Sequence, residues 1–552
     1  MRYLRAPGLA VLPLLLGLLF FATSLTPSLI PRDWLVQGVL GGVVMALGYG
    51  VGKAIGAVWW LMALPPLKGR IATIVHLVFA VPVAVVVVLC LMQTQDWQNG
   101  IRTRMGLAPV TDVHTLRMIA MTIVVFTLMM LLAYALRYLF DRVRHWLYRY
   151  MPQRTADVAG FVLTAFVLLI VTRDGVLDYV ITALDRSYTL GQALFDDAPP
   201  PPTRALQSGS TASLVDWGAM GQPGRDYVLR GPDAADITAF SGRPALDPLR
   251  VYVGLAQSET PEARAAVALA ELQRVGGFER SVLIIALPTG TGWLDPGSVD
   301  TVEYMHGGDI ATVAVQYSYL QSPLALILET RAGLDQAREL IRTVHGYWRS
   351  LPHETRPKLY IHGLSLGAWS SMYGTDLFAL LDDPIDGAFW TGPPFPSATW
   401  QAITAERAPD SPYVAPIIGN GQLVRFASHT RDAGGPDGWG TSMRLMFLQY
   451  SSDPIVFYEP ASLFRAPAWM SEPPASDVSP ELRFMPIVTQ FQLAMDMALA
   501  NTAPPGHGHA YYGPDYIGPW VAVTDPPNWS AADTARLIAH CDTGFQNGCA
   551  AE

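Results

Sequence analysis

The clearest chemistry in the chain lies at Gly363-Leu364-Ser365-Leu366-Gly367, directly after the apolar residues 359–361. A serine between two glycines at the end of a strand is typical of a nucleophile elbow. There the serine adopts a strained backbone conformation, and a Cβ at 363 or 367 would clash with the neighbouring backbone. The alternative is a glycine-rich strand end without chemistry, since the G-x-S-x-G pattern alone is weak. The strand before it and the helix-tolerant residues after it favour a nucleophile.

A serine hydroxyl needs a base to take its proton, so the chain must also supply a histidine and a carboxylate. In this type of site the acid follows the serine and the histidine comes last. Asp453 follows the apolar residues 444–450, and we predict it to be the acid, although Asp before Pro is also an ordinary turn residue. The glycine-rich residues 504–513 carry His507 and His509. We favour His509 as the base; His507 is the alternative, or it orients His509 or contacts substrate.

Acyl transfer also needs N–H donors for the oxyanion that forms on the substrate. One donor is expected from the residue after the nucleophile, Leu366, and the other from a loop after an early strand. Residues 287–293 form such a loop, and Thr289, Gly290 and Thr291 are its candidate donors. A simple turn is the alternative interpretation of this loop.

The chain has 3 cysteines, of which Cys90 lies in an apolar stretch. Cys541 and Cys549 lie close together near the C-terminus, and we predict a disulfide between them, with two unpaired thiols as the alternative. No Cys and His spacing suggests zinc, and His507-x-His509 has no evident third ligand nearby. We therefore expect neither a metal nor another cofactor.

These residues must be positioned by a sheet, because short apolar stretches alternate with helical patterns through the second half of the chain. The predicted strands fall within residues 249–255, 280–293, 310–320, 358–369, 387–393 and 444–458, and the clearest helices within 260–277 and 333–351. This alternation predicts an α/β fold with a mostly parallel sheet flanked by helices, whose active groups gather at the carboxyl ends of the strands. Residues 400–423 have no such pattern and are expected to form a lid.

The first third of the chain is apolar and predicts a membrane-embedded helical bundle. Overall, 51% of residues are hydrophobic and only 15% are charged. Five apolar stretches are visible at about 8–30, 35–62, 71–93, 116–138 and 156–180, and four are long enough to cross the hydrocarbon core. The fifth is the weakest, because Arg173 and Asp174 interrupt it.

Charge is divided unevenly along the chain. Up to residue 155 there are 14 Lys and Arg against 4 Asp and Glu, so the remainder is acidic, which argues against binding of nucleic acid. If the N-terminus and the second and fourth connections are cytoplasmic, that side carries nine Lys and Arg against four outside. Five spans then place residues after 180 on the extracytoplasmic side, in agreement with the expected disulfide.

Composition also suggests where the domains divide. Residues 186–211 contain four consecutive prolines, which favour an extended linker. We therefore expect a transmembrane helical domain at 1–185, a Pro-rich linker at 186–211 and a catalytic domain at 212–552.

Taken together, these motifs resemble a bacterial family of membrane-anchored α/β-hydrolases, which join an N-terminal hydrophobic module to a C-terminal catalytic module. The resemblance covers nearly the whole chain and rests on SLTPSLIPR (24–32), GYGVG (48–52), SLVDWGAMGQPGRDYV (213–228), PTGTGW (288–293), GLSLG (363–367), SSDP (451–454) and GHGHAYY (506–512). It implies a serine hydrolase with Ser365, Asp453 and one of the two loop histidines in the catalytic positions, but it implies no substrate. Arg225 is a candidate for binding an anionic group of the substrate, with a structural salt bridge as the alternative.

The expected function is a serine hydrolase that cleaves carboxylic esters, of lipids or of envelope components, through an acyl intermediate on Ser365. The protein is expected in the bacterial plasma membrane as a multi-pass protein, with an amphiphilic ester and the membrane as its partners. One alternative is an acyltransferase that uses the same residues. Another is a transporter or sensor whose folded domain only binds a ligand; His76 in the third apolar stretch and the glycines at 48–52 motivate it.

Overall fold

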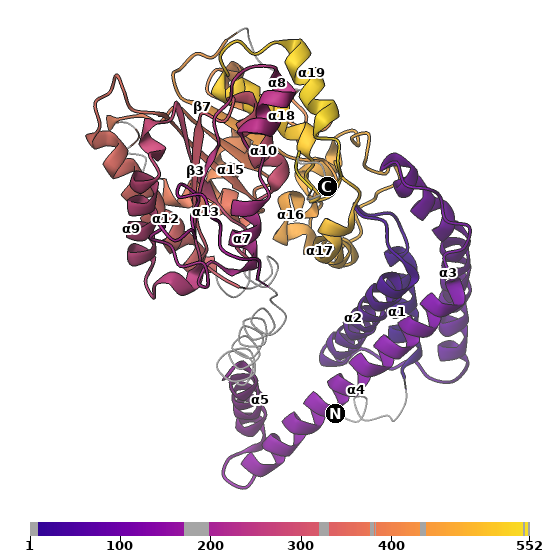
Figure 1. The fold of residues 1–552 in the computed structure, drawn as a ribbon. Helices are drawn as coiled ribbons and strands as arrows, with labels where there is room; N and C mark the ends of the chain where they lie inside the picture. The colour runs from indigo at the N-terminus through magenta and orange to yellow at the C-terminus, as the bar shows by residue number, and fades with distance from the viewer. Residues whose placement is uncertain are drawn as a thin grey trace. The chain divides into compact units, whose positions relative to one another are not determined.

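The computed structural model describes residues 9–170, 198–319, 330–375, 380, 382–430, 438–544 and 547–549 (Figure 1). The chain divides into two compact units. The first comprises Met1–Ile181 together with Tyr458–Leu499, and the second comprises Thr182–Phe457 and Ala500–Glu552. We call Tyr458–Leu499 the insert. The sequence analysis did not separate it from the catalytic domain expected at 212–552.

Five described helices of the first unit come from the N-terminal part of the chain. They are α1 (Val11–Ser24), α2 (Trp34–Leu61), α3 (Gly69–Arg104), α4 (Thr115–Leu147) and α5 (Gln153–Ile170). By length and composition, α2, α3 and α4 could each cross a membrane. This confirms three apolar helices of the five predicted spans. The first predicted span, 8–30, is interrupted where α1 ends at Ser24, and the last part of the fifth, 171–180, lies outside the described residues.

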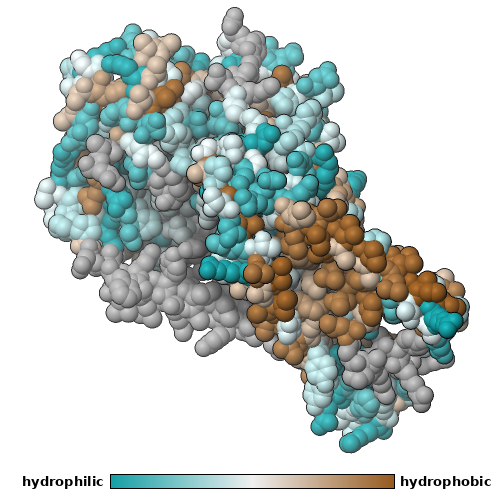
Figure 2. Space-filling view, turned by 90° about the vertical axis from the view of Figure 1, so that its right-hand side faces the viewer, coloured by the Kyte–Doolittle hydropathy of each residue, from teal (hydrophilic) through white to brown (hydrophobic). Residues whose placement is uncertain are grey.

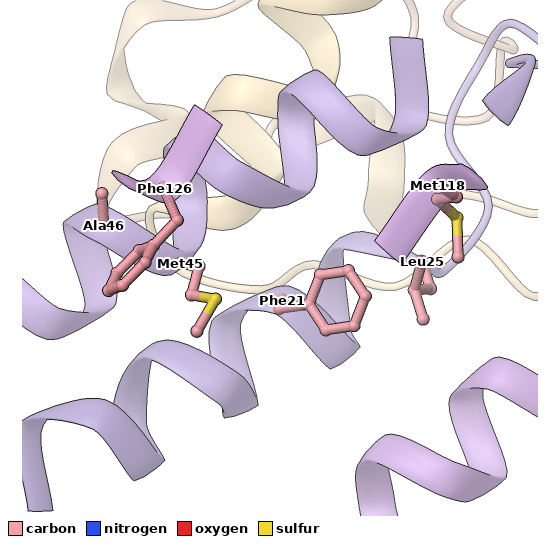
Figure 3. Close-up of a cluster of buried hydrophobic side chains, with 6 residues drawn as sticks. All are labelled: Phe21, Leu25, Met45, Ala46, Met118 and Phe126. Carbon is pink, nitrogen blue, oxygen red and sulfur yellow. The ribbon is translucent and has the colours of Figure 1, made fainter. Parts of the chain in front are cut away.

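Small residues let the first helices pack closely. A Cβ on Gly42 of α2 would lie 2.5 Å from Cβ of Val125 on α4, and a Cβ on Gly52 would lie 2.6 Å from Cα of Pro13 on α1. The buried side chains between these helices are Phe21, Leu25, Met45, Ala46, Met118 and Phe126 (Figure 3). Close helix packing therefore accounts for Gly48 and Gly52 of the motif that had motivated a transporter or sensor, but not for Gly50, whose added Cβ would have nothing within 4 Å.

The outer surface of α3 is apolar. Ten of its large hydrophobic side chains are each more than half exposed: Ile71, Ile74, Leu77, Val78, Phe79, Val81, Val85, Val88, Leu89 and Met92. Figure 2, which views the molecule from the side where α3 lies in Figure 1, shows a broad hydrophobic surface. A water-exposed protein rarely leaves so much apolar surface uncovered, whereas hydrocarbon would cover it at no cost.

The insert adds its own helices to the first unit. They are the short η6 (Pro460–Leu463) and η7 (Ala468–Ser471) and the longer α17 (Val488–Leu499). Helix α17 packs against α1, α2 and η6.

The second unit is built on a parallel sheet of seven described strands in the order β1-β3-β2-β4-β5-β7-β6. The strands are β1 (Leu249–Val253), β2 (Val282–Leu287), β3 (Ile310–Val315), β4 (Lys358–Leu364), β5 (Gly387–Thr391), β6 (Val424–Ala427) and β7 (Arg444–Leu448). The predicted parallel sheet is confirmed. The short β6 was not predicted, because four residues directly after the expected lid carry too little pattern.

Helices cover both faces of this sheet (Figure 1). One face is covered by α9 (Pro261–Arg274), α12 (Thr330–Ser350) and α13 (Leu366–Gly374), and the other by α10 (Pro296–Met305), α18 (Gly513–Thr524) and α19 (Ala531–His540). The remaining described α-helices of this unit are α7 (Gly221–Leu229), α8 (Ala234–Ser241), α15 (Ala398–Ala405) and α16 (Pro454–Phe457), and its short 3-10 helices are η3 (Leu255–Gln257), η4 (Gly277–Glu279), η5 (Gly419–Gly421) and η8 (Ala500–Thr502). The start of α9 follows from its sequence, because the Thr260 hydroxyl caps it by accepting from the Ala263 N–H at 3.2 Å.

Candidate active site

Ser365 stands at the corner between β4 and α13 and has a strained backbone, with φ 56° and ψ −122°. Its side chain is nearly buried, and its N–H donates to the Thr391 carbonyl at 2.9 Å. A Cβ on Gly363 would lie 2.4 Å from the Gly367 carbonyl carbon, and a Cβ on Gly367 would lie 2.0 Å from the Leu287 carbonyl oxygen. Both glycines are therefore required by close backbone contacts, and the corner has the geometry of a nucleophile elbow.

Asp453 and His509 form a buried pair at the carboxyl end of β7. His509 Nδ1 lies 2.7 Å from Asp453 Oδ2, and the other carboxylate oxygen, Oδ1, accepts from the Ile455 N–H at 2.8 Å. Asp453 is fully buried and His509 nearly so. Because the carboxylate accepts the proton on Nδ1, the imidazole is held with Nε2 as its basic nitrogen. His509 Nε2 has no hydrogen-bond partner among the described residues.

A layer of tyrosines supports this pair and was missed at the sequence level. The Tyr511 hydroxyl donates to Asp453 Oδ2 at 2.8 Å, and the Tyr511 ring stacks on that of Tyr450 with centroids 4.4 Å apart. The Tyr450 hydroxyl in turn donates to Asp515 Oδ2 at 2.6 Å. Burial and the neighbouring Asp453 raise the pKa of Tyr511 well above its usual value, so it remains a donor. In the sequence, only its position two residues after His509 could have indicated that Tyr511 belongs to the site.

The loop that carries both histidines is tight and is tied to the acid. Gly506 and Gly508 have positive φ values of 84° and 56°, which a glycine tolerates best. The Gly508 N–H donates to the Ser452 hydroxyl oxygen at 2.9 Å, so the loop is fastened to the residue before Asp453. His507 faces elsewhere: its ring contacts that of His429, with centroids 4.9 Å apart. Of the two candidate bases, His509 is therefore the one paired with Asp453.

The His509 ring lies beside Gly392, the residue after Thr391, and Thr391 is hydrogen-bonded to the Ser365 backbone. A Cβ on Gly392 would lie 2.8 Å from His509 Cε1, and Gly392 directly follows Thr391, whose carbonyl accepts from the Ser365 N–H. No hydrogen bond joins the Ser365 hydroxyl to His509 Nε2 in the described structure. Such bonds often tighten only when substrate binds, so the arrangement is compatible with proton transfer.

The candidate oxyanion loop lies next to the elbow, since Leu287 and the Pro288 carbonyl contact Gly367. The Thr289 N–H and hydroxyl both donate to the Trp293 carbonyl, at 3.0 and 3.2 Å, so they are engaged within the loop. The N–H groups of Gly290, Thr291 and Leu366 have no acceptor in the described part of the chain. Within the described residues, three of the four predicted donor residues therefore have an N–H without an intramolecular acceptor.

Two residues hold this loop that were not identified from the sequence. The Gln316 amide donates to the Thr291 carbonyl at 2.9 Å, and the Tyr252 hydroxyl donates to the Gly292 carbonyl at 2.8 Å. A Cβ on Gly292 would lie 2.4 Å from the Tyr252 hydroxyl oxygen, which explains a glycine there. The sheet brings both residues to this loop, because Tyr252 lies on β1 and Gln316 directly follows β3.

Arg225, the predicted anion-binding residue, is buried in α7. Burial lowers its pKa from the usual value. Its neighbour Gly224 packs closely on the Tyr252 ring, where a Cβ would lie 2.3 Å from Cδ1. Helix α7 is thereby linked to the residue that supports the oxyanion loop. Contact of Arg225 with a substrate stays a prediction.

Two further features were found elsewhere in this unit. His362 on β4 lies 2.8 Å from both the Phe389 carbonyl and the Ser298 hydroxyl, and burial lowers its pKa to about 4, so it is neutral. At the C-terminus a disulfide joins Cys541 to Cys549, and the Cys549 N–H donates to Asp300 at 2.9 Å.

Comparison with known proteins places this arrangement in a family. A model of an alpha/beta-hydrolase family matches residues 249–537, and a model of the N-terminus of an alpha/beta-hydrolase family matches residues 25–232. No curated protein and no solved structure matches the chain. The first match spans more than half of the chain and includes Ser365, Asp453 and His509. With both modules present in order, the chain belongs to this alpha/beta-hydrolase family, which has its own N-terminal module.

Proposed function

We propose that the protein is a membrane-tethered serine hydrolase that cleaves carboxylic esters through an acyl intermediate on Ser365. The observation that carries the proposal is the buried Asp453–His509 pair, whose Nε2 has no partner among the described residues, in one unit with a serine that has the strained backbone of an elbow. Membership of an alpha/beta-hydrolase family supports hydrolysis in general.

In the proposed reaction, His509 Nε2 takes the proton of the Ser365 hydroxyl as the oxygen attacks the ester carbonyl. The N–H groups of Leu366 and of Gly290 or Thr291 would stabilise the oxyanion. His509 then gives the proton to the departing alcohol, and water releases the acid by the same route in reverse. Asp453 holds the imidazole in the required tautomer and stabilises its protonated form.

The proposed substrates are esters of lipids or of envelope components. Three apolar helices and the exposed surface of α3 support a tether in the membrane, which would keep the site close to amphiphilic esters. The Cys541–Cys549 disulfide supports an oxidising compartment, so we place the catalytic unit on the extracytoplasmic side of the plasma membrane.

A fluorophosphonate probe tests the nucleophile directly, because it reacts only with an activated serine. Full-length wild-type protein in membranes should be labelled, and Ser365→Ala should not be labelled. The matched control is Ser370→Ala, five residues further along α13, which should leave labelling intact. An unlabelled wild-type protein, or equal labelling of Ser365→Ala, would refute the proposal.

The two loop histidines provide a second, internal control. His509→Ala should reduce kcat for a short p-nitrophenyl ester by about a thousandfold or more, because the serine loses its base. His507→Ala should cost far less, because His507 contacts His429 and does not pair with Asp453. A larger loss for His507→Ala than for His509→Ala would reverse the assignment. Added sugar or lipid alcohols in the same assay would reveal an acyltransferase by the appearance of a new ester.

A further inference from the structure

The insert separates the acid from the base along the chain. Asp453 is followed by α16, which ends at Phe457, and the insert begins at the next residue. The insert ends at Leu499, and η8 and the His509 loop follow. Asp453 and His509 belong to the second unit, whereas the insert between them folds with the N-terminal helices as part of the first. The segments that carry the acid and the base are therefore both continuous with the first unit.

The insert is closed on itself by one side chain. Gln490 of α17 accepts from the Ser462 hydroxyl and donates to the hydroxyl oxygen of Tyr458, the first residue of the insert. This joins the start of the insert to its last helix. A displacement of α17 would therefore be passed to both ends of the insert.

Helix α17 is fixed to the turn between α1 and α2 by a buried carboxylate. Asp496 Oδ1 accepts from the Ser28 hydroxyl at 2.9 Å, and Oδ2 accepts from the Leu29 N–H at 2.9 Å. One turn earlier, the Gln492 amide donates to the Thr26 carbonyl at 3.0 Å. All of these partners lie within SLTPSLIPR (24–32), a motif for which the proposed chemistry has no use.

Asp496 provides geometric specificity to this contact in addition to packing. It is fully buried, and the nearby guanidinium of Arg32 partly compensates its charge. A buried carboxylate is costly unless its oxygens are satisfied, and an apolar side chain would pack at lower cost. The carboxylate makes the contact geometrically specific, since its two oxygens accept from a hydroxyl and a backbone N–H in one defined geometry. The contact therefore fixes the position of α17 on the turn.

We propose that Asp496 is a positioning residue for the catalytic Asp453–His509 pair, and that the N-terminal unit thereby sets the efficiency of the second unit. The inference rests on the proposed function. The connection runs through the chain, because α17 ends at Leu499 and the next residue, Ala500, accepts from the His509 N–H through its carbonyl at 2.9 Å. The backbone of His509 is therefore hydrogen-bonded to the residue directly after the insert.

The test uses the full-length protein and compares Asp496→Asn with Ser28→Ala and with the double variant. A carboxamide has one acceptor oxygen and one N–H₂ donor in place of two acceptor oxygens. It can accept from the Leu29 N–H only with its N–H₂ group facing Ser28, whose hydroxyl must then accept where it donated before, and the negative charge is lost. Titration with the fluorophosphonate counts competent sites, and the turnover of a short p-nitrophenyl ester then gives kcat per competent site. Glu481→Gln is the matched control, because it removes the same charge from an exposed position of the insert.

We expect Asp496→Asn to lower kcat per competent site about tenfold with KM changed less than twofold. Ser28→Ala should lower it a few-fold, the double variant should be no worse than Asp496→Asn, and Glu481→Gln should match the wild type. The pH profile of kcat/KM should shift in Asp496→Asn, because the pairing of His509 with Asp453 is altered. If Asp496→Asn cannot be purified, Ser28→Ala tests the inference through the same two measurements, kcat per competent site and the pH profile of kcat/KM.

Two results would count against the inference and are distinguishable from failure of the proposed function. Fewer competent sites that each turn over at the wild-type rate, with an unchanged pH profile, would show that Asp496 only stabilises the fold. Equal activity of all variants would overturn the inference in the same way. A wild-type protein without any labelling would overturn the proposed function and, with it, this inference.

Discussion

Ser365 is positioned by close backbone contacts at the ends of adjacent strands, whereas Asp453 and His509 meet from segments on either side of the insert. At the elbow, Gly363 and Gly367 permit backbone contacts that would otherwise be sterically impossible. On the acid and base side, the contacts are hydrogen bonds between side chains and loops, including Tyr511 to Asp453 and Gly508 to Ser452. The proposed nucleophile is thus fixed by backbone sterics, and its proposed acid and base are fixed by a distributed polar network.

This difference determines how activity should be lost when residues on each side are substituted. A steric constraint in the backbone is all or none, because a single added carbon displaces a strand end or a loop. A polar network can lose one member and keep the rest, so its losses should be graded. Apart from Asp453 and His509 themselves, variants of the supporting residues on the two sides should therefore separate into steep and graded effects.

The largest effect is expected from Asp453→Asn. The asparagine would fill the same volume but could present an N–H₂ group to His509 Nδ1, which favours the wrong tautomer. We expect kcat/KM to fall about a thousandfold to ten-thousandfold with little loss of folded protein. Ester hydrolysis and thermal unfolding check this, with the exposed Asp410→Asn as control. A loss below about tenfold would remove Asp453 from the catalytic residues.

Gly367→Ala tests the steric side. Its Cβ would lie 2.0 Å from the Leu287 carbonyl oxygen, so the start of the oxyanion loop or the elbow must move. We expect activity to fall about a hundredfold, the usual order for a misplacement of about 1 Å, and the free energy of unfolding to fall by about 2–4 kcal/mol. Gly346→Ala in α12 is the control, since nothing lies within 4 Å of its added Cβ. Equal behaviour of the two variants would contradict the steric account.

Tyr511→Phe tests the graded side. It removes one hydrogen bond to Asp453, while the Ile455 N–H and His509 remain in place. A hydrogen bond to a charged group contributes about 1.5–3 kcal/mol, so kcat should fall about tenfold to a hundredfold. Tyr373→Phe, at an exposed position of α13, is the control. A complete loss of activity would show that this side is as steep as the elbow.

The two sides also differed in how far the sequence revealed them. The elbow and the parallel sheet were predictable, because strand, turn and glycines are adjacent in the chain and each has a steric reason. For the base, the sequence could only favour His509 over His507, since residues two apart in a glycine-rich loop leave the direction of both rings open. The pairing with Asp453 appears only when the fold brings the two loops together.

The parts that the sequence did not reveal all depend on distant contacts. Tyr511 and Gln316 act through bonds to Asp453 and Thr291, and neither residue type is distinctive at its position. The insert escaped notice because its association with α1 and α2 depends on single polar residues such as Asp496. In the bundle, apolar composition predicted helices but placed the end of the first one too late, since Pro27 and Pro31 discourage a helix there.

Acidification provides the mildest test of the comparison. Burial raises the pKa of Asp515, which accepts from Tyr450 behind Tyr511, to about 6, whereas His362 behind the elbow has a pKa of about 4. Because the folded protein binds the Asp515 proton more tightly than the unfolded chain does, this group makes unfolding easier as the pH rises from about 4 to about 6. It contributes at most about 1.4 kcal/mol per pH unit. We expect Asp515→Asn to remove this contribution from the pH dependence of the free energy of unfolding, measured by thermal unfolding from pH 4 to 7. The exposed Asp410→Asn should retain the whole slope. A slope unchanged in Asp515→Asn would show that the polar network behind Asp453 does not titrate in this range.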